Sequence, residues 1–209
     1  MFKVNIITLK QKKPIFFLMM SENFAKIILK TVPKWVKSCE IVNNELMITV
    51  YPDFVAPMCH FLKKNALTRC SQLIDITAVD YPDRENRFTV VYNLLSIDLN
   101  ARVRLKTEVD GLTSIESVTG IYSCAGWWER ETWDMFGVFF TGHPDLRRIL
   151  TDYGFQGHPL RKDFPLTGYT EVRYDATEKR VISEPLELAQ EFRSFDFTSP
   201  WEPLDKSTK

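Results

Sequence analysis

The sequence contains no glycine-rich phosphate loop, no closely spaced cysteine pair and no nucleophile beside a general base. These absences argue against nucleotide-binding and hydrolytic sites of the known motif types. No two of its cysteines lie within four residues of each other, so the usual ligand spacing of zinc and iron–sulfur sites is missing. We expect four free thiols and no disulfide framework, at Cys39, Cys59, Cys70 and Cys124.

Long apolar runs are also missing. The longest run near the start, Ile15–Met20, has six residues, whereas a bilayer-spanning helix needs about 20. We therefore expect no transmembrane segment. The formal net charge is zero, which disfavours a general nucleic-acid-binding surface.

The charge is unevenly distributed along the chain. In residues 1–37, eight Lys against one acid, Glu22, give +7, which leaves −7 for the rest of a neutral chain. Residues 1–34 therefore form a basic arm, with a short helix expected after Ser21. Such an arm can serve targeting, an acidic lipid surface or an acidic partner, or it can be a solvated terminus.

Residues 35–140 have the pattern of a compact α+β domain, with a mostly antiparallel or mixed sheet and flanking helices. Alternating or β-branched runs predict strands at Lys34–Val42, Glu45–Tyr51, Gln72–Asp80, Arg87–Ile97 and Ala101–Val109. Helical spacing predicts a helix capped by Asp53, with Val55, Met58, Cys59 and Leu62 on its buried face, and a second helix over Ala125–Phe136 ended by Gly137. Thr113–Glu116 fits a capping box that opens a short helical turn, and Val138–Thr141 fits a short strand.

Residues 141–209 are predicted to form a long extended, proline-rich interaction tail. Prolines recur at positions 144, 159, 165, 185, 200 and 203, and they interrupt long regular elements. The segment is nevertheless rich in Phe, Tyr and Trp. Since such side chains need a surface to lie on, this tail is expected to rest on other proteins.

The stretch from Trp127 to Asp175 is dense in charge and can be read in two ways. On the predicted helix, Glu131 and Asp134 share a face, and Arg130 is placed to pair with Asp134. Paired carboxylates can act as general acid and base or bind a metal. Because no His joins them on the helix, and because His143, Asp145 and His158 do not supply four well-spaced ligands, we favour an interface over a catalytic or metal site. Arginines suit such an interface, since their planar fork clamps carboxylates.

The stretch GWWERETWDMFGVFFTGHPDLRRILTDYGFQGHPLRKDFPLTGYTEVRYD resembles the signature of the 30-kDa (NuoC-type) subunit of respiratory complex I, the proton-pumping NADH:ubiquinone oxidoreductase. The resemblance extends over roughly residues 35 to 203. It implies a subunit with no catalytic residues and no cofactor of its own, since FMN, the iron–sulfur clusters and quinone belong to partner subunits. The implied subunit-interface residues are Glu129, Arg130, Glu131, Asp134, His143, Asp145, Arg147, Arg148, His158, Arg161, Lys162, Asp163 and Tyr174.

The resemblance also implies partners and a location. The partners would be the 49-kDa (NuoD-type) subunit and the PSST (NuoB-type) subunit that holds the last iron–sulfur cluster. The location would be the matrix side of the mitochondrial inner membrane, or the cytoplasmic side of a bacterial plasma membrane. The equivalent subunit of a membrane-bound hydrogenase-type complex is an alternative with the same features.

Overall fold

The computed structural model describes residues 25–43 and 45–197, and it divides the chain into one unit that ends at Leu166 and a second that begins at Thr167. The division falls later than the predicted start of the tail at residue 141, because residues 142–164 are hydrogen-bonded to the first unit. Most of the predicted basic arm, with the Ser21 cap, lies outside the described residues. Residues 25–31 are helical, and Ala25 and Ile28 are buried.

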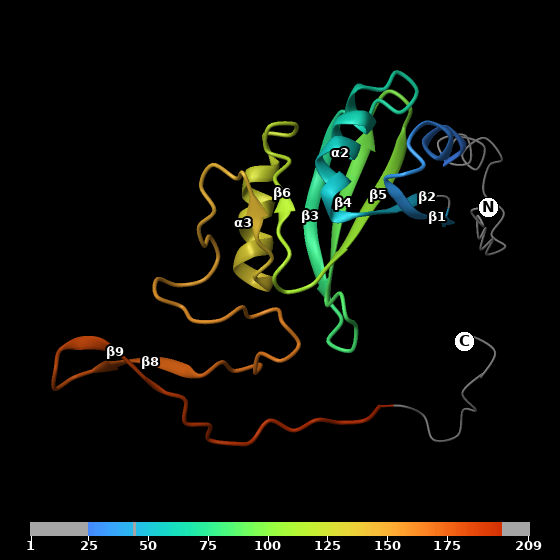
Figure 1. The fold of residues 1–209 in the computed structure, drawn as a ribbon. Coiled ribbons are helices and arrows are strands. Elements are labelled where there is room, and N and C mark those ends of the chain that lie inside the picture. The colour runs from blue at the N-terminus through green and yellow to red at the C-terminus, as the bar shows by residue number, and fades with distance from the viewer. Residues whose placement is uncertain (1–24, 44, 198–209) are drawn as a thin grey trace. The chain divides into compact units, whose positions relative to one another are not determined.

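The first unit is built on a mixed sheet, which confirms the predicted α+β class. In the described part of the chain this sheet has five strands in the order β1-β2-β5-β4-β3. The pair β2·β5 is parallel, and the other neighbouring pairs are antiparallel. The strands, marked in Figure 1, are β1 (Val36–Val42), β2 (Glu45–Val50), β3 (Gln72–Asp80), β4 (Phe88–Ser96) and β5 (Ala101–Val109).

One face of this sheet carries the core. Ile48, Ile76, Tyr92 and Leu105 are neighbours in register across four strands, and each is at most 1% exposed. Helix α2 (Val55–Lys64) lies over this face (Figure 1) and buries the four residues predicted from its spacing. The predicted cap at Asp53 is wrong: a 3-10 turn, η1 (Pro52–Phe54), precedes the helix and puts Phe54 at the cap.

The opposite face of the sheet is polar, as the alternation in β5 predicted. A ladder of hydrogen bonds crosses four strands there: Asn93 Nδ2 donates to Asp75 (2.7 Å), and Arg104 donates to Asn93 Oδ1 (3.0 Å) and Glu45 (3.1 Å). Cross-strand pairs of this kind stabilise neighbouring strands by about 0.2–1 kcal/mol each. The polar face is therefore held together by its own side chains.

The predicted helical turn at Thr113–Glu116 is wrong. Residues Ile115–Glu116 instead form strand β6, which pairs in parallel with β7 (Phe140–Thr141). Asp110 accepts the backbone N–H groups of Leu112 and Thr113 (3.2 and 2.6 Å) and so turns the chain before β6. Ile115 is fully buried. Burial and pairing with a distant strand therefore outweigh the local capping pattern.

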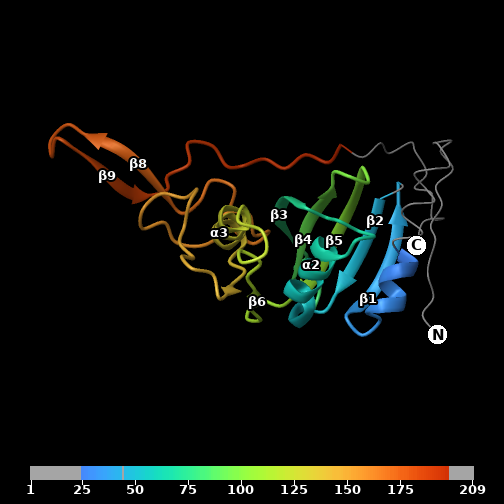
Figure 2. The same cartoon turned by 90° about the horizontal axis from the view of Figure 1, so that it is seen from above.

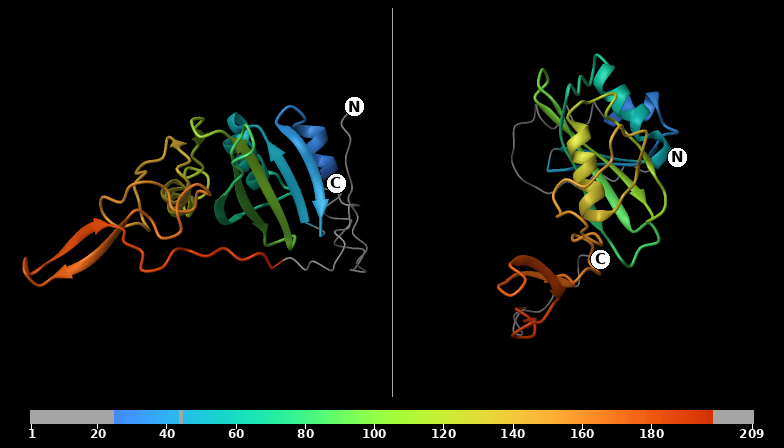
Figure 3. Two further views of the ribbon diagram at one scale, coloured as in Figure 1. Left: turned by 90° about the horizontal axis from the view of Figure 1, so that it is seen from below. Right: turned by 90° about the vertical axis from the view of Figure 1, so that its left-hand side faces the viewer.

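Helix α3 (Ala125–Phe136) has the bounds predicted from the sequence. It ends at Gly137, whose φ of 78° is the left-handed conformation expected of a C-terminal glycine. The helix lies along the outer side of β3 (Figures 2 and 3), where Thr132 Oγ1 is 3.3 Å from Ile76 O and Cys124 Sγ is 3.5 Å from Leu73 O. It therefore covers an edge strand that would otherwise offer unpaired carbonyls.

The second unit contains a β-hairpin that the sequence analysis did not predict. Strands β8 (Thr170–Asp175) and β9 (Arg180–Pro185) pair antiparallel. No proline interrupts residues 166–184, so the proline spacing that suggested an irregular tail does not apply to them. Lys179, with φ 54°, sits in the connecting turn.

Within the part of the chain that the structure describes, every helix is too short or too polar to span a bilayer.

Candidate docking site

Most of the charged stretch forms one structural feature of the first unit, made of helix α3 and the loop of residues 142–164 that lies against it. The end of the stretch, from Thr167 on, belongs to the second unit. Three carboxylates with side chains 0% exposed organise this feature: Asp80, Glu129 and Asp134. A buried carboxylate is costly unless hydrogen bonds satisfy it. Where each finds its donors therefore determines how the loop is held.

Asp134 holds the first half of the loop. Its carboxylate accepts the backbone N–H groups of Ile149 (3.1 Å), Leu150 (2.8 Å) and Thr151 (2.9 Å). It also accepts the Thr151 hydroxyl (2.7 Å) and Arg148 Nη1 (3.0 Å). Burial alone would raise the pKa of the Asp134 carboxyl, but these hydrogen bonds outweigh it and lower the pKa to about 2.

The predicted pairing of Arg130 with Asp134 is wrong. Arg130 instead donates to the backbone carbonyls of Arg147 (3.1 Å) and Arg148 (3.3 Å). Asp134 is already surrounded by donors from the loop, so the contact within the helix is replaced by contacts to a segment that follows it. Both residues thus hold the same turn of the loop, one through a carboxylate and the other through a guanidinium.

Glu129 holds the segment before the helix. It accepts Ser117 Oγ (2.6 Å) and the Val118 N–H (2.8 Å), and burial raises the pKa of this carboxyl. His143 Nε2 lies 3.9 Å from it and 3.1 Å from Gly126 O. His143 Nδ1 accepts the Asp145 N–H (3.0 Å). His143 therefore joins the loop to the start of α3.

Asp80 holds the end of the loop. Arg87 binds both of its oxygens (2.7 and 2.8 Å), and the Lys162 N–H donates to it as well (2.8 Å). The Arg87 hydrogen bonds are the main reason that the pKa of the Asp80 carboxyl is lowered. Arg87 also reaches Asp163 at 3.0 Å. Sequence reasoning missed Asp80 and Arg87, although an opposite-charge pair at the facing ends of two consecutive predicted strands was the available signal.

Arg161 and His158 close over the end of α3. Arg161 Nε donates to Phe136 O (2.6 Å), and its guanidinium lies 5.2 Å from the centre of the Phe88 ring. His158 Nδ1 is 3.0 Å from Asp134 O, and burial lowers the pKa of its ring. Both side chains approach Gly137 so closely that a β-carbon there would collide with them.

The thirteen predicted interface residues thus differ in their surroundings. Asp134 and Glu129 are fully buried inside the chain, whereas Glu131 on the same helix is only half-buried. Tyr174 is exposed and belongs to the second unit. The exposed members of the first unit are Asp145, Arg147, Lys162 and Asp163, and its half-buried members are Arg130, Glu131, His143, Arg148, His158 and Arg161.

Large apolar side chains point outward around this feature. Trp127 on α3 is 70% exposed, and Tyr153 in the loop is fully exposed. The other exposed apolar residues nearby in sequence are Phe139, Leu150, Leu160 and Leu166. Exposed apolar side chains in number, framed by polar residues, mark protein-interaction surfaces. We call the loop of residues 142–164 together with α3 the docking site.

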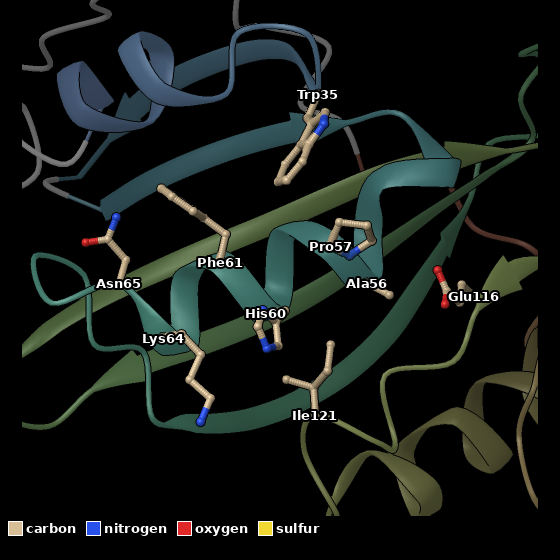
Figure 4. A pocket seen from close by; sticks show the side chains of 9 residues that line it. All are labelled: Trp35, Ala56, Pro57, His60, Phe61, Lys64, Asn65, Glu116 and Ile121. Carbon is tan, nitrogen blue, oxygen red and sulfur yellow. The ribbon is translucent and has the colours of Figure 1, made fainter.

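A groove of about 620 Å³ lies elsewhere in the first unit, along the outer side of α2. Figure 4 shows Trp35, Phe61 and Ile121 around it, with His60 and Lys64 projecting from the helix. Its lining contains no residue of the charged stretch. The groove is therefore a separate feature from the docking site.

The four cysteines are free thiols. Among the residues that the structure describes, no three His, Cys, Asp or Glu side chains gather as a metal ion would require. Cys39, Cys59 and Cys70 are buried, and Cys124 is exposed. Burial raises the pKa of the Cys39 thiol to about 11 and that of Cys70 to about 12, so both are held in the thiol form.

Fold and site together define an α+β domain in which buried carboxylates shape a surface loop. The chain belongs to the family described as the 30-kDa subunit of respiratory-chain NADH dehydrogenase, whose model matches residues 48–170. It is 60% identical to NADH-ubiquinone oxidoreductase subunit 9 of Prototheca wickerhamii over 90% of this chain and 98% of that one. It is 59% identical to NADH dehydrogenase (ubiquinone) iron-sulfur protein 3 of Marchantia polymorpha over 88% of this chain and 94% of that one.

A solved structure shares the fold. One chain of the membrane-bound sulfane sulfur reductase, an archaeal respiratory membrane complex, superposes with a TM-score of 0.60 at 28% identity. The match covers 69% of this chain and 85% of that chain. The same α+β unit thus occurs in respiratory complexes with different chemistry.

Proposed function

We propose that this chain is a structural subunit of the hydrophilic arm of NADH:ubiquinone oxidoreductase and has no catalytic residue of its own. Its role would be to hold the 49-kDa and PSST-type subunits in fixed positions, since electron transfer to ubiquinone depends on their geometry. Support comes from the family and from relatives that carry the name of this enzyme. We place it on the matrix side of the mitochondrial inner membrane, with FMN, iron–sulfur clusters and quinone held by partner subunits.

The observation that carries this proposal is the way in which the docking site uses its charge. The carboxylates of Asp80, Glu129 and Asp134 accept hydrogen bonds from backbone and side chains of the same chain. What they present outward is an ordered loop with exposed rings and aliphatic side chains. A buried acid used to fix backbone, beside apolar residues left exposed, suits a surface for a protein partner.

The signature residues would then contribute to the interface in two ways. The buried ones act without contacting a partner themselves: Asp134 positions the loop, and Glu129 positions the segment that precedes α3. The exposed ones would contact a partner directly, and Arg147 and Asp145 at 2.9 Å from each other are an example. Exposed ion pairs contribute little to the stability of a single chain, so these are free to exchange partners on binding.

The hairpin of the second unit supports the same proposal. By register, Val172, Tyr174 and Val181 lie on one face, and all three are exposed. Arg173 and Glu184 pair on the other face, with both hydrogen bonds at 2.7 Å. An isolated two-stranded hairpin is at best marginally stable in water, so its apolar face is expected to lie on another subunit.

The proposal is tested by isolating the tagged full-length chain in mild detergent. We expect it to co-purify with NADH dehydrogenase activity, FMN and a 49-kDa-type subunit. A chain that elutes alone, or with proteins that do not oxidise NADH, would contradict the proposal.

A second candidate is the equivalent subunit of a membrane-bound hydrogenase-type complex. The shared fold with the sulfane sulfur reductase chain shows that this unit occurs beyond quinone-reducing enzymes. The identity of about 60% to NADH-ubiquinone oxidoreductase subunits favours the first candidate. Metal analysis of the isolated complex separates the two, because nickel would indicate a hydrogenase and FMN the NADH-oxidising enzyme.

A further inference from the structure

Residues 148–157 form a closed loop within the docking site. Arg148 Nη1 donates to Asp134 (3.0 Å) at the start of this loop and to Gly157 O (2.9 Å) at its end. The three N–H groups that bind Asp134 fix the backbone of residues 149–151. A single guanidinium and a single buried carboxylate thus tie both ends of the loop to α3.

The tip of this loop is a β-turn. The Phe155 N–H donates to Asp152 O (3.1 Å), and Gly154 has a φ of 71°, which glycine adopts without strain. The Tyr153 N–H donates to the Asp152 carboxylate (2.7 Å). Phe155 packs on Phe164, with ring centres 5.9 Å apart, and so faces back toward the loop. The turn therefore packs the half-buried Phe155 ring against Phe164 and directs the Tyr153 ring outward.

Tyr153 is 103% exposed. Single exposed apolar residues are common on protein surfaces. Here, however, the buried Asp134 carboxylate fixes the backbone just before the turn, and the half-buried Phe155 ring packs just after it, so the backbone loses little conformational freedom on binding. Tyrosines presented in this way are typical of residues that dominate binding energy in protein interfaces.

We propose that Tyr153 is an anchor that inserts its ring into an apolar pocket on another protein subunit of the same assembly. This inference rests on the proposed function, which supplies the multisubunit assembly. It goes further by assigning the contact to one side chain. In this proposal Asp134, Arg148 and Gly154 together hold the loop in the conformation that directs the Tyr153 ring outward.

The first test compares variants of the tagged full-length chain by the amount recovered in the assembled complex. Tyr153→Ala is expected to reduce recovery by about ten-fold or more, as loss of a dominant anchor does. Tyr153→Phe is expected to keep most of it, because it keeps the ring. Leu112→Ala is the matched control: Leu112 is 93% exposed and also sits in a turn held by an Asp carboxylate, away from the docking site.

The second test measures accessibility directly, with Cys124→Ser as background because Cys124 is exposed. Tyr153→Cys also lacks the ring and should assemble poorly, but it is expected to react with a maleimide in the free chain and to be protected in the small fraction that assembles. Leu112→Cys is expected to react in both states. A maleimide–benzophenone crosslinker on position 153 is expected to capture a different subunit. Capture of lipid or of a second copy of this chain would overturn the proposal.

The outcomes separate the two levels of inference. If the unaltered chain is not found in an NADH-oxidising complex, the proposed function fails. If the unaltered chain and Leu112→Ala assemble but Tyr153→Ala assembles equally well, or Tyr153→Cys is labelled in the complex, only the anchor fails. If Tyr153→Phe were recovered in the complex as poorly as Tyr153→Ala, this would contradict insertion of the ring into an apolar pocket.

Discussion

Two carboxylates on α3, Glu129 and Asp134, show how hydrogen bonding and burial compete at single residues. Both are fully buried. Asp134 has five donors and a pKa lowered to about 2, whereas Glu129 has two close donors and a pKa raised mainly by burial. On the same helix, hydrogen bonds therefore stabilise the ionised form of Asp134, whereas burial favours the protonated form of Glu129.

Asp134→Asn is expected to destabilise the first unit by about 3 kcal/mol, because it removes the buried charge that pairs with half-buried Arg148 and offers an amide donor to groups that need an acceptor. Thermal or denaturant unfolding of the full-length chain measures this. Asp145→Asn is the control, since the Asp145–Arg147 pair is exposed, and no measurable change is expected there. Equal stability of both variants would show that Asp134 does not hold the loop.

The same residue predicts a pH dependence. The folded-state pKa of Asp134 is about 2, below its ordinary value of 3.8, so ionisation favours the folded state. Its contribution is complete above about pH 5 and is lost as the pH falls from about 4 toward 2, amounting to about 2–3 kcal/mol. The stability difference between the natural chain and Asp134→Asn should therefore shrink over this range. A difference that stays constant with pH would contradict the assigned shift.

At the scale of elements, the end of α3 depends on Gly137. Gly137→Ala is expected to destabilise the chain by about 2–4 kcal/mol, because its φ of 78° disfavours a β-carbon and the new methyl would meet Arg161 and His158. Unfolding measurements test this. Gly120→Ala is the matched control, as nothing lies within 4 Å of its would-be β-carbon. If both variants behaved alike, the close packing at Gly137 would be disproved.

Elements set by local pattern were predictable from the sequence. The bounds of β3, β5 and α3 follow from alternation, helical spacing and a terminal glycine, and all three signals depend only on residues close together in the sequence. The alternation in β5 likewise identified the polar face that carries Arg104.

Elements and contacts set by distant partners were not predictable. The Ile115–Glu116 strand exists because Phe140 pairs with it, and the partners of Asp134 come from residues 148–151, which a helical wheel cannot show. The hairpin of the second unit was not predicted because the prolines on either side of it suggested an irregular tail, although the run between them alternates. Non-local pairing is the physical cause in the first two cases.

The two faces of the hairpin lead to a prediction about assembly. Val181→Asp places a charge on the apolar face beside Tyr174 and is expected to lower the amount of assembled complex several-fold, because burying an unpaired charge is costly. Ala176→Asp adds the same charge in the turn, away from that face, and should assemble normally. Native gels stained for NADH dehydrogenase activity provide the measurement. Normal assembly of Val181→Asp would show that this face stays in water.

At the scale of the whole molecule, a scaffold and a catalyst respond differently to substitution. A scaffold variant reduces the number of complexes but leaves each one intact, whereas a catalytic variant leaves the number unchanged and lowers the rate of each. Arg161 is a suitable residue for this distinction. It belongs to the signature, and its guanidinium contacts Phe136 O and the Phe88 ring within the first unit.

Arg161→Ala is therefore expected to lower the amount of assembled complex at least two-fold and to leave ubiquinone reduction per FMN unchanged. The physical reason is that Phe136 O loses its donor and the loop loses its closure over α3, while no reacting group is touched. Arg102→Ala, on the polar sheet face, is the control and should change neither quantity. Unchanged assembly with a lowered turnover per FMN would instead assign Arg161 a direct part in the reaction.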